Sequence, residues 1–171
     1  MNLPNKLTIF RILLIPIIII CLYIGTYYYN LLALVLFIVA VLTDIVDGKI
    51  ARDKNLITKF GIFMDPLADK ILVLSVLLMF IEFGLIPAWM VIIIIAREFI
   101  VSGIRLVSSK DIPANIWGKV KSGIQMTVVI AILILIVIQN IWLDQFAYWS
   151  MFLVAIITII SIFGYLPRVK L

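Results

Sequence analysis

Residues 44–69 read Asp44-Ile-Val-Asp47-Gly48-Lys-Ile-Ala51-Arg52, then eight further residues, then Gly61-Ile-Phe-Met-Asp65-Pro-Leu-Ala-Asp69. The four aspartates quoted lie at the facing ends of two apolar segments, where a carboxylate is costly unless something binds it. We therefore predict that these four side chains hold divalent metal at the edge of a membrane, for phosphoryl chemistry on a lipid.

The composition of the chain is that of an integral membrane protein. Of its 171 residues, 65% are hydrophobic and 13% are charged, and the mean hydropathy is +1.30, whereas about a quarter of the residues of a soluble domain are charged. The apolar runs are too long for strands and do not alternate with polar residues, so they predict helices. The sequence contains no histidine, which excludes imidazole catalysis and histidine-ligated metal.

The apolar runs predict an all-α bundle of six transmembrane helices, because each run is near the ~20 residues that a bilayer requires. No repeat or linker divides the chain, so we expect one domain over residues 1–171. The expected helices cover Leu7–Tyr27, Leu31–Arg52, Gly61–Phe83, Ala88–Val107, Gly118–Ile138 and Phe146–Phe163. Pro66 either kinks the third helix or marks its start.

The first apolar run carries Arg11 and Pro16 and has no cleavage site after it, so we expect a retained helix and not a signal peptide. Cys21 lies within this run and is the only cysteine of the chain, so it forms no intramolecular disulfide and is expected to pack in the core.

Basic residues predict the orientation of the chain in the membrane. The connections after the first, third and fifth expected helices contain no lysine or arginine, whereas the other connections and both termini carry nearly all of the fourteen. By the positive-inside rule both termini, and with them residues 44–69, face the cytoplasm. The net charge of +5 therefore reflects topology, and no nucleic-acid partner is expected.

The spacing of the motif places its polar residues on one side of each helix. On an ideal helix the motif positions of the first segment fall within about 140°, and those of the second within about 80°. If the two helix ends face each other, the carboxylates converge and would repel one another without bound cations. All-oxygen ligands suit Mg²⁺ or Mn²⁺. Four carboxylates are enough for two ions, and such a pair can stabilise the attacking and leaving oxygens of a phosphoryl displacement.

Small residues lie on the same faces. Gly48, Ala51 and Gly61 would let a flat or bulky group approach the backbone, and Arg52 could hold a phosphate or a base edge. Carboxylates within a membrane can also form a cation pathway, which leaves a transporter or channel as the alternative. A pathway needs polar positions across the full thickness of the membrane, whereas the four aspartates lie at one edge.

The motif resembles the signature of the CDP-alcohol phosphatidyltransferase family, Asp-x-x-Asp-Gly-x-x-Ala-Arg, eight residues, then Gly-x-x-x-Asp-x-x-x-Asp, with every fixed position present. Other segments are similar to the bacterial phosphatidylglycerophosphate synthase branch of that family, namely Asn2–Arg11, Phe60–Lys70, Ala96–Phe99, Gly103–Arg105 and Gly118–Ser122. The resemblance implies transfer of the phosphatidyl group from CDP-diacylglycerol to glycerol 3-phosphate with release of CMP. Inositol phosphate, serine and phosphatidylglycerol are the alternative acceptors within the family.

The resemblance also implies roles for single residues. Asp44, Asp47, Asp65 and Asp69 would ligate two Mg²⁺ or Mn²⁺ ions on the diphosphate, and Asp69 would also act as the general base. The residues expected to bind CDP-diacylglycerol are Asn5, Thr8, Arg11, Gly48, Ala51, Arg52 and Gly61. The family further implies a homodimer in the cell membrane.

A phosphorylated acceptor needs cations of its own. The candidates are Arg97, Arg105, Lys110, Lys119 and Lys121, of which Arg105 and Lys121 lead. Arg97 and Glu98 lie about ten residues into the fourth expected helix, near mid-bilayer by the rise per residue, where charges usually pair and face the bundle. We therefore interpret Glu98 as structural or as the support of a residue in the site, and Arg97 as either of these or a deep phosphate contact.

Overall fold

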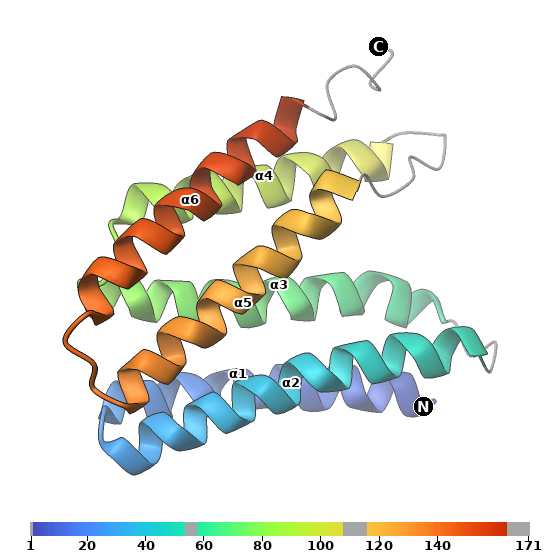
Figure 1. The fold of residues 1–171 in the computed structure, drawn as a ribbon. Coiled ribbons are helices and arrows are strands. Elements are labelled where there is room, and N and C mark those ends of the chain that lie inside the picture. Colours follow the sequence, from blue (N-terminus) through green and yellow to red (C-terminus); the bar gives the residue numbers. More distant parts are fainter. Residues whose placement is uncertain (1, 54–57, 108–115, 164–171) are drawn as a thin grey trace. The chain divides into compact units, whose positions relative to one another are not determined.

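The computed structural model describes residues 2–53, 58–107 and 116–163, and six helices follow one another along these ranges (Figure 1). They are α1 (Leu3–Ile24), α2 (Tyr27–Asp53), α3 (Lys59–Glu82), α4 (Ala88–Val107), α5 (Ile116–Val137) and α6 (Leu143–Phe163). No strand occurs in the three ranges. The prediction of an all-helical chain is therefore confirmed for the residues described.

The observed bounds of α4 match the predicted range, and the other helices differ from it at one or both ends. α1 starts at Leu3 and not at Leu7, because Pro4 in its first turn has the fixed φ angle that a helix needs and requires no hydrogen-bond acceptor there. Pro66 lies inside α3, which starts seven residues earlier at Lys59, so its interpretation as a helix start is wrong.

The turn between α1 and α2 is residues 25–26 and not 28–30, because α1 ends at Ile24 and α2 begins at Tyr27. Gly25 ends α1 with φ 71°, a left-handed conformation that favours glycine, and its N–H donates to the carbonyl of Cys21 at 3.3 Å. The side-chain amide of the buried Asn30 then donates to the carbonyl of Gly25 at 3.1 Å. Cys21 itself is buried and free, as predicted.

The chain forms two compact units, residues 1–79 with 133–139 and residues 80–132 with 140–171. In the first unit α1 packs along α2 (Figure 1). Ile18 on α1 and Ala33, Phe37 and Ala40 on α2 are almost fully buried. The two alanines recur with helical spacing on the buried face of α2, and such small residues let two helices approach closely in a membrane.

In the second unit α4 packs against α6 (Figure 1). Met90 and Ile94 on α4 and Ala147, Met151 and Ala155 on α6 have at most 1% of their surface exposed. Each set repeats every four residues, so it lies along one face of its helix. The same faces continue into the polar residues described below.

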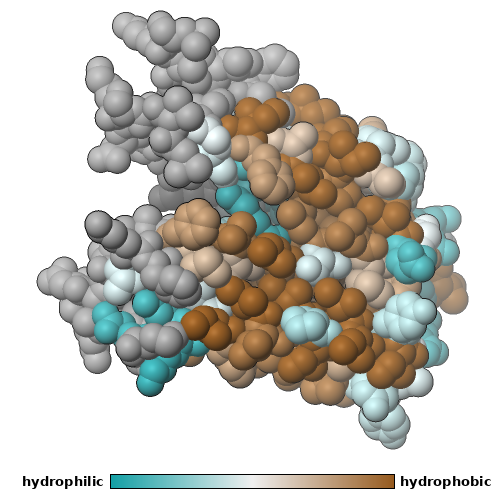
Figure 2. All heavy atoms as spheres, turned by 180° about the vertical axis from the view of Figure 1, so that it is seen from behind, coloured by the Kyte–Doolittle hydropathy of each residue, from teal (hydrophilic) through white to brown (hydrophobic). Residues whose placement is uncertain are grey.

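The outer surface of the helices is apolar, as a membrane environment requires. Within the described residues, four segments are long and apolar enough to cross a bilayer, namely Asn5–Ile24, Tyr27–Val46, Val120–Val137 and Leu143–Ser161. Side chains as hydrophobic as Leu13 and Ile92 are about 60% exposed, and brown, hydrophobic spheres cover most of the described surface in Figure 2. The chain is therefore a helical membrane protein, and six spans with a defined orientation remain a prediction.

Candidate active site

Three buried polar side chains on α1, Asn5, Thr8 and Arg11, form what we call the α1 polar row. They lie three residues apart, so they share one face of the helix, and their exposed fractions are 8%, 0% and 0%. Polar side chains within a bundle need partners, because no water is at hand to replace a missing hydrogen bond. Each member of the row contacts a different neighbouring segment.

Arg11 and Thr8 contact the first aspartates of the two motif halves. Nη1 of Arg11 lies 2.7 Å from Oδ1 of Asp44 on α2, and Oγ1 of Thr8 donates to Oδ1 of Asp65 on α3 at 2.5 Å. Because the two donors are one turn apart on α1, the two carboxylates are brought to adjacent levels of a single helix. The structure thus brings together one aspartate from each half of the motif.

Asn5 ties the start of α3 to α1 through Thr58. Oγ1 of Thr58 donates to Oδ1 of Asn5 at 2.9 Å and accepts the N–H of Gly61 at 3.0 Å. Thr58 is thus the N-cap of α3, since its side chain binds the third N–H of the helix.

Gly61 is buried where the α1 polar row and α3 meet. A Cβ atom at Gly61 would lie 3.3 Å from both Oδ1 of Asn5 and Oγ1 of Thr58, and 3.4 Å from Oδ2 of Asp65. The missing side chain therefore makes room for the polar contacts around Asp65.

The two carboxylates are partly open to the outside. The Asp44 side chain is 38% exposed while that of Arg11 is fully covered, and Asp65 is half-buried. Arg11 thus approaches Asp44 from within the bundle, and the remaining surface of the carboxylate is accessible to a ligand. Its donor atoms are oxygens, which suit hard divalent cations.

The other two predicted metal ligands are Asp69 on α3 and Asp47 on α2. Asp69 follows Asp65 by one turn of α3 and is half-buried. Asp47, Gly48, Ala51 and Arg52 belong to the last turns of α2, and their side chains lie outside those described. Among the described side chains, no three of the metal-ligating types are grouped as a metal site would require. The carboxylate oxygens of Asp44 and Asp65 are of the kind that fits a divalent cation.

In the second unit, Arg97, Glu98, Lys121 and Ser161 form what we call the charge cluster. Nζ of Lys121 on α5 donates to Oε1 of Glu98 on α4 at 2.7 Å, and Nη1 of Arg97 donates to the same oxygen at 3.2 Å. Nε of Arg97 donates to Oγ of Ser161 on α6 at 3.0 Å. The prediction that Arg97 and Glu98 are paired within the bundle is confirmed.

The remaining candidates for acceptor binding are placed by the backbone only or not at all. Arg105 lies in the last turn of α4 and Lys119 in the first turn of α5, with side chains outside those described. Lys110 lies outside the described residues. The side chain of Lys121, in contrast, is 1% exposed and forms an ion pair with Glu98.

Comparison with known protein families shows to which family the chain belongs. The family model of the CDP-alcohol phosphatidyltransferases matches residues 1–162, which include both motif halves and the α1 polar row. The chain belongs to the CDP-alcohol phosphatidyltransferase family. Phosphatidyltransferases of this family generally depend on a divalent metal, for which the carboxylate oxygens of Asp44 and Asp65 are suitable donors.

Curated relatives of this phosphatidyltransferase carry one shared name, CDP-diacylglycerol–glycerol-3-phosphate 3-phosphatidyltransferase. The protein of Bacillus subtilis is 47% identical over 148 residues, which cover 78% of this chain and 77% of the relative. That of Rickettsia felis is 38% identical over 99% of this chain and 96% of its own length. That of Salmonella choleraesuis is 33% identical over 99% of this chain and 95% of its own length.

Sequence reasoning missed Thr58 and the bridging position of Glu98. A threonine just before a helical run is an N-cap signal, so Thr58 could have been found once the start of α3 was placed correctly. The contact between Glu98 and Lys121 joins residues 23 positions apart on different helices. No spacing within one helix predicts it.

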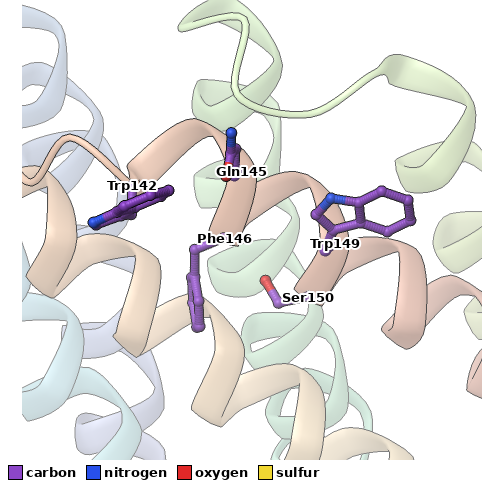
Figure 3. A pocket seen from close by; sticks show the side chains of 5 residues that line it. All are labelled: Trp142, Gln145, Phe146, Trp149 and Ser150. Carbon is purple, nitrogen blue, oxygen red and sulfur yellow. The ribbon is translucent and has the colours of Figure 1, made fainter.

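A separate pocket of about 480 Å³ lies at the start of α6. It is lined by Trp142, Gln145, Phe146, Trp149 and Ser150, all from α6 and the turn before it (Figure 3). None of these side chains is charged, so the pocket offers neither metal ligands nor cations for a phosphate. Tryptophans at the start of an apolar helix are typical of the membrane–water interface.

Proposed function

We propose that this phosphatidyltransferase moves the phosphatidyl group of CDP-diacylglycerol to sn-glycerol 3-phosphate and releases CMP. The observation that carries the proposal is the identity of 38–47%, over most of the chain, with relatives named for this reaction. The contacts of Asp44 and Asp65 with the α1 polar row support it. These contacts bring one carboxylate from each motif half to the same face of α1.

The reaction exchanges one phosphorus–oxygen bond for another. A hydroxyl oxygen of glycerol 3-phosphate attacks the phosphorus on the lipid side of the diphosphate, and the bond from that phosphorus to the CMP oxygen breaks. CMP leaves with the bonding electron pair. We propose Asp69 as the base that takes the hydroxyl proton, on the ground of the family resemblance. Such a displacement depends mainly on positioning and charge stabilisation.

Four aspartates, Asp44, Asp47, Asp65 and Asp69, would hold two Mg²⁺ or Mn²⁺ ions. When bound, these ions would neutralise charge on the diphosphate. The α1 polar row keeps two of the carboxylates in place: Arg11 holds Asp44 and Thr8 holds Asp65. Their partners in the structure are thus the aspartates, and we propose positioning of these carboxylates as their first role, with contact to the nucleotide as a second.

Further groups would bind the two substrates. We propose that Gly48, Ala51, Arg52 and Gly61 line the cytidine site beside Asn5, and that cations of the second unit bind the phosphate of the acceptor. Of the candidates, Lys121 and Arg97 lie together in the charge cluster, where both pair with Glu98. Arg105, Lys110 and Lys119 remain candidates on the strength of their charge and their place in the chain.

We propose six spans with both termini and the active site on the cytoplasmic side of the cell membrane. The connections of residues 25–26, 83–87 and 138–142 contain no lysine or arginine, which supports this orientation. We also propose a homodimer, on the ground of the family resemblance, and cross-linking in native membranes tests it.

Release of CMP by the purified protein tests the proposed reaction. The protein in detergent with CDP-diacylglycerol and Mg²⁺ is expected to release CMP when glycerol 3-phosphate is added, and EDTA should abolish the release. Serine, inositol phosphate and phosphatidylglycerol serve as a panel of alternative acceptors. Metal-dependent release with one of these alone would reassign the acceptor, and no release with any alcohol would contradict the proposed function.

A further inference from the structure

The charge cluster has an unusual feature: one carboxylate oxygen serves two cations from two helices. Oε1 of Glu98 accepts from Nζ of Lys121 at 2.7 Å and from Nη1 of Arg97 at 3.2 Å. Because the two nitrogens share one small acceptor, they lie close enough for a single phosphate group to contact both. The two cations thus lie side by side on one carboxylate oxygen.

The two cations are held in place within the helix bundle. Arg97 is fixed on its other side by Ser161, whose hydroxyl donates in turn to the carbonyl of Thr158 at 2.7 Å. The exposed fractions of the side chains are 6% for Arg97 and 1% for Lys121, against 19% for Glu98. A buried ammonium is costly without a compensating charge, and the carboxylate of Glu98, 2.7 Å from Nζ of Lys121, supplies that charge.

We propose that Glu98 is a positioning residue for the acceptor: it holds Lys121 and Arg97 in place, and these two cations bind the phosphate of the acceptor. The inference rests on the proposed function, which supplies a phosphorylated acceptor. It goes further by giving a role to a carboxylate that lies outside the motif. An anionic residue thereby supports the binding of an anionic substrate, through the cations that it holds.

The Glu98→Gln variant tests the inference. Glutamine keeps the shape of the side chain and an acceptor oxygen but removes the charge that compensates the two cations. We expect the KM for glycerol 3-phosphate to rise by at least about 10-fold, the scale of losing a charged hydrogen bond. The KM for CDP-diacylglycerol should change by less than about 3-fold. Glu98→Asp, which keeps the charge on a shorter side chain, should give an intermediate KM for glycerol 3-phosphate.

Glu82→Gln is the matched control, because Glu82 is an exposed glutamate at the end of α3. The same loss of charge there should leave both KM values unchanged. An equal rise in both KM values of Glu98→Gln, or a lower thermal midpoint with unchanged KM values, would show a structural role only and overturn the inference. A lower KM for glycerol 3-phosphate would overturn it too, because the carboxylate would then compete with the phosphate.

Binding measured without turnover separates this inference from the proposed function. Glycerol 3-phosphate should raise the thermal midpoint of the unmodified protein and of Glu82→Gln, and should raise that of Glu98→Gln much less. This result would support the inference even if no CMP were released, in which case the proposed reaction alone would be wrong. Equal stabilisation of all three proteins would contradict the inference while leaving the reaction intact.

Discussion

Thr8 shows how much one hydroxyl group can contribute in a bundle. It is fully buried and donates to a carboxylate. A hydrogen bond to a charged group contributes about 1.5–3 kcal/mol. We expect Thr8→Val, which keeps the shape and loses the donor, to lower kcat/KM by about 10- to 100-fold. Thr8→Ser keeps the hydroxyl and should stay within about 5-fold of the unmodified enzyme. Rates of CMP release measure both, and equal losses in the two variants would argue for packing as the role of Thr8.

Arg11 and Asp44 are expected to depend on each other. The side chain of Arg11 is fully buried and that of Asp44 is partly exposed. The ion pair should therefore contribute more than an exposed pair and less than a buried one. We expect Arg11→Met and Asp44→Asn each to lower the free energy of unfolding by about 1–3 kcal/mol. The double variant should lose less than the sum, by at least about 1 kcal/mol. SDS titration in mixed micelles measures the cycle, and strict additivity would show that the contact contributes nothing.

At the scale of elements, α1 and α3 approach each other closely at Gly61. Gly61→Ala would put a Cβ 3.3 Å from polar atoms of Asn5 and Thr58, so those two groups must shift slightly. We expect CMP release to fall by about 10-fold or more, because small displacements of catalytic groups are costly. Gly123→Ala on α5 is the control, since nothing lies within 4 Å of a Cβ there. It should be neutral or slightly stabilising, because alanine is the better helix former. Full activity of Gly61→Ala would show that the junction tolerates movement.

The sequence predicted the helices well and their partners poorly. Continuous apolar runs mark the body of each helix, and α4 was predicted to the residue because Pro87 precedes it and its last turn is followed by a polar stretch. The starts of α1 and α2 were missed, because proline within a first turn and a two-residue turn held by Asn30 are local details. A run of hydrophobic residues does not reveal them.

The contacts among residues of the candidate site could not be predicted from the sequence. The spacing of the motif pointed to both Asp44 and Asp65, and the opening segment pointed to Thr8 and Arg11. The sequence did not show that the second pair binds the first, because a contact between two helices depends on their packing. For the same reason the shared oxygen of Glu98 was found only in the structure.

At the scale of the whole molecule, the proposed orientation can be tested with single cysteines, because the native Cys21 is buried. Ile141 is 88% exposed in the turn before α6. We expect Ile141→Cys to react with a membrane-impermeant maleimide in intact cells. Lys170→Cys, in the C-terminal tail, should react only after the membrane is permeabilised. Labelling in the reverse order would place the active site on the outside, and the unmodified protein serves as the unlabelled background.

Because the α1 polar row lies on one face of α1, the orientation of this helix affects the whole candidate active site. A rotation of this helix about its own axis moves all three polar side chains away from their partners together. The opposite face of α1 carries Phe10, Leu13 and Ile17, which are 45%, 60% and 45% exposed. A hydrophobic compound that binds this face from within the lipid and turns the helix would therefore inhibit the enzyme without competing with either substrate.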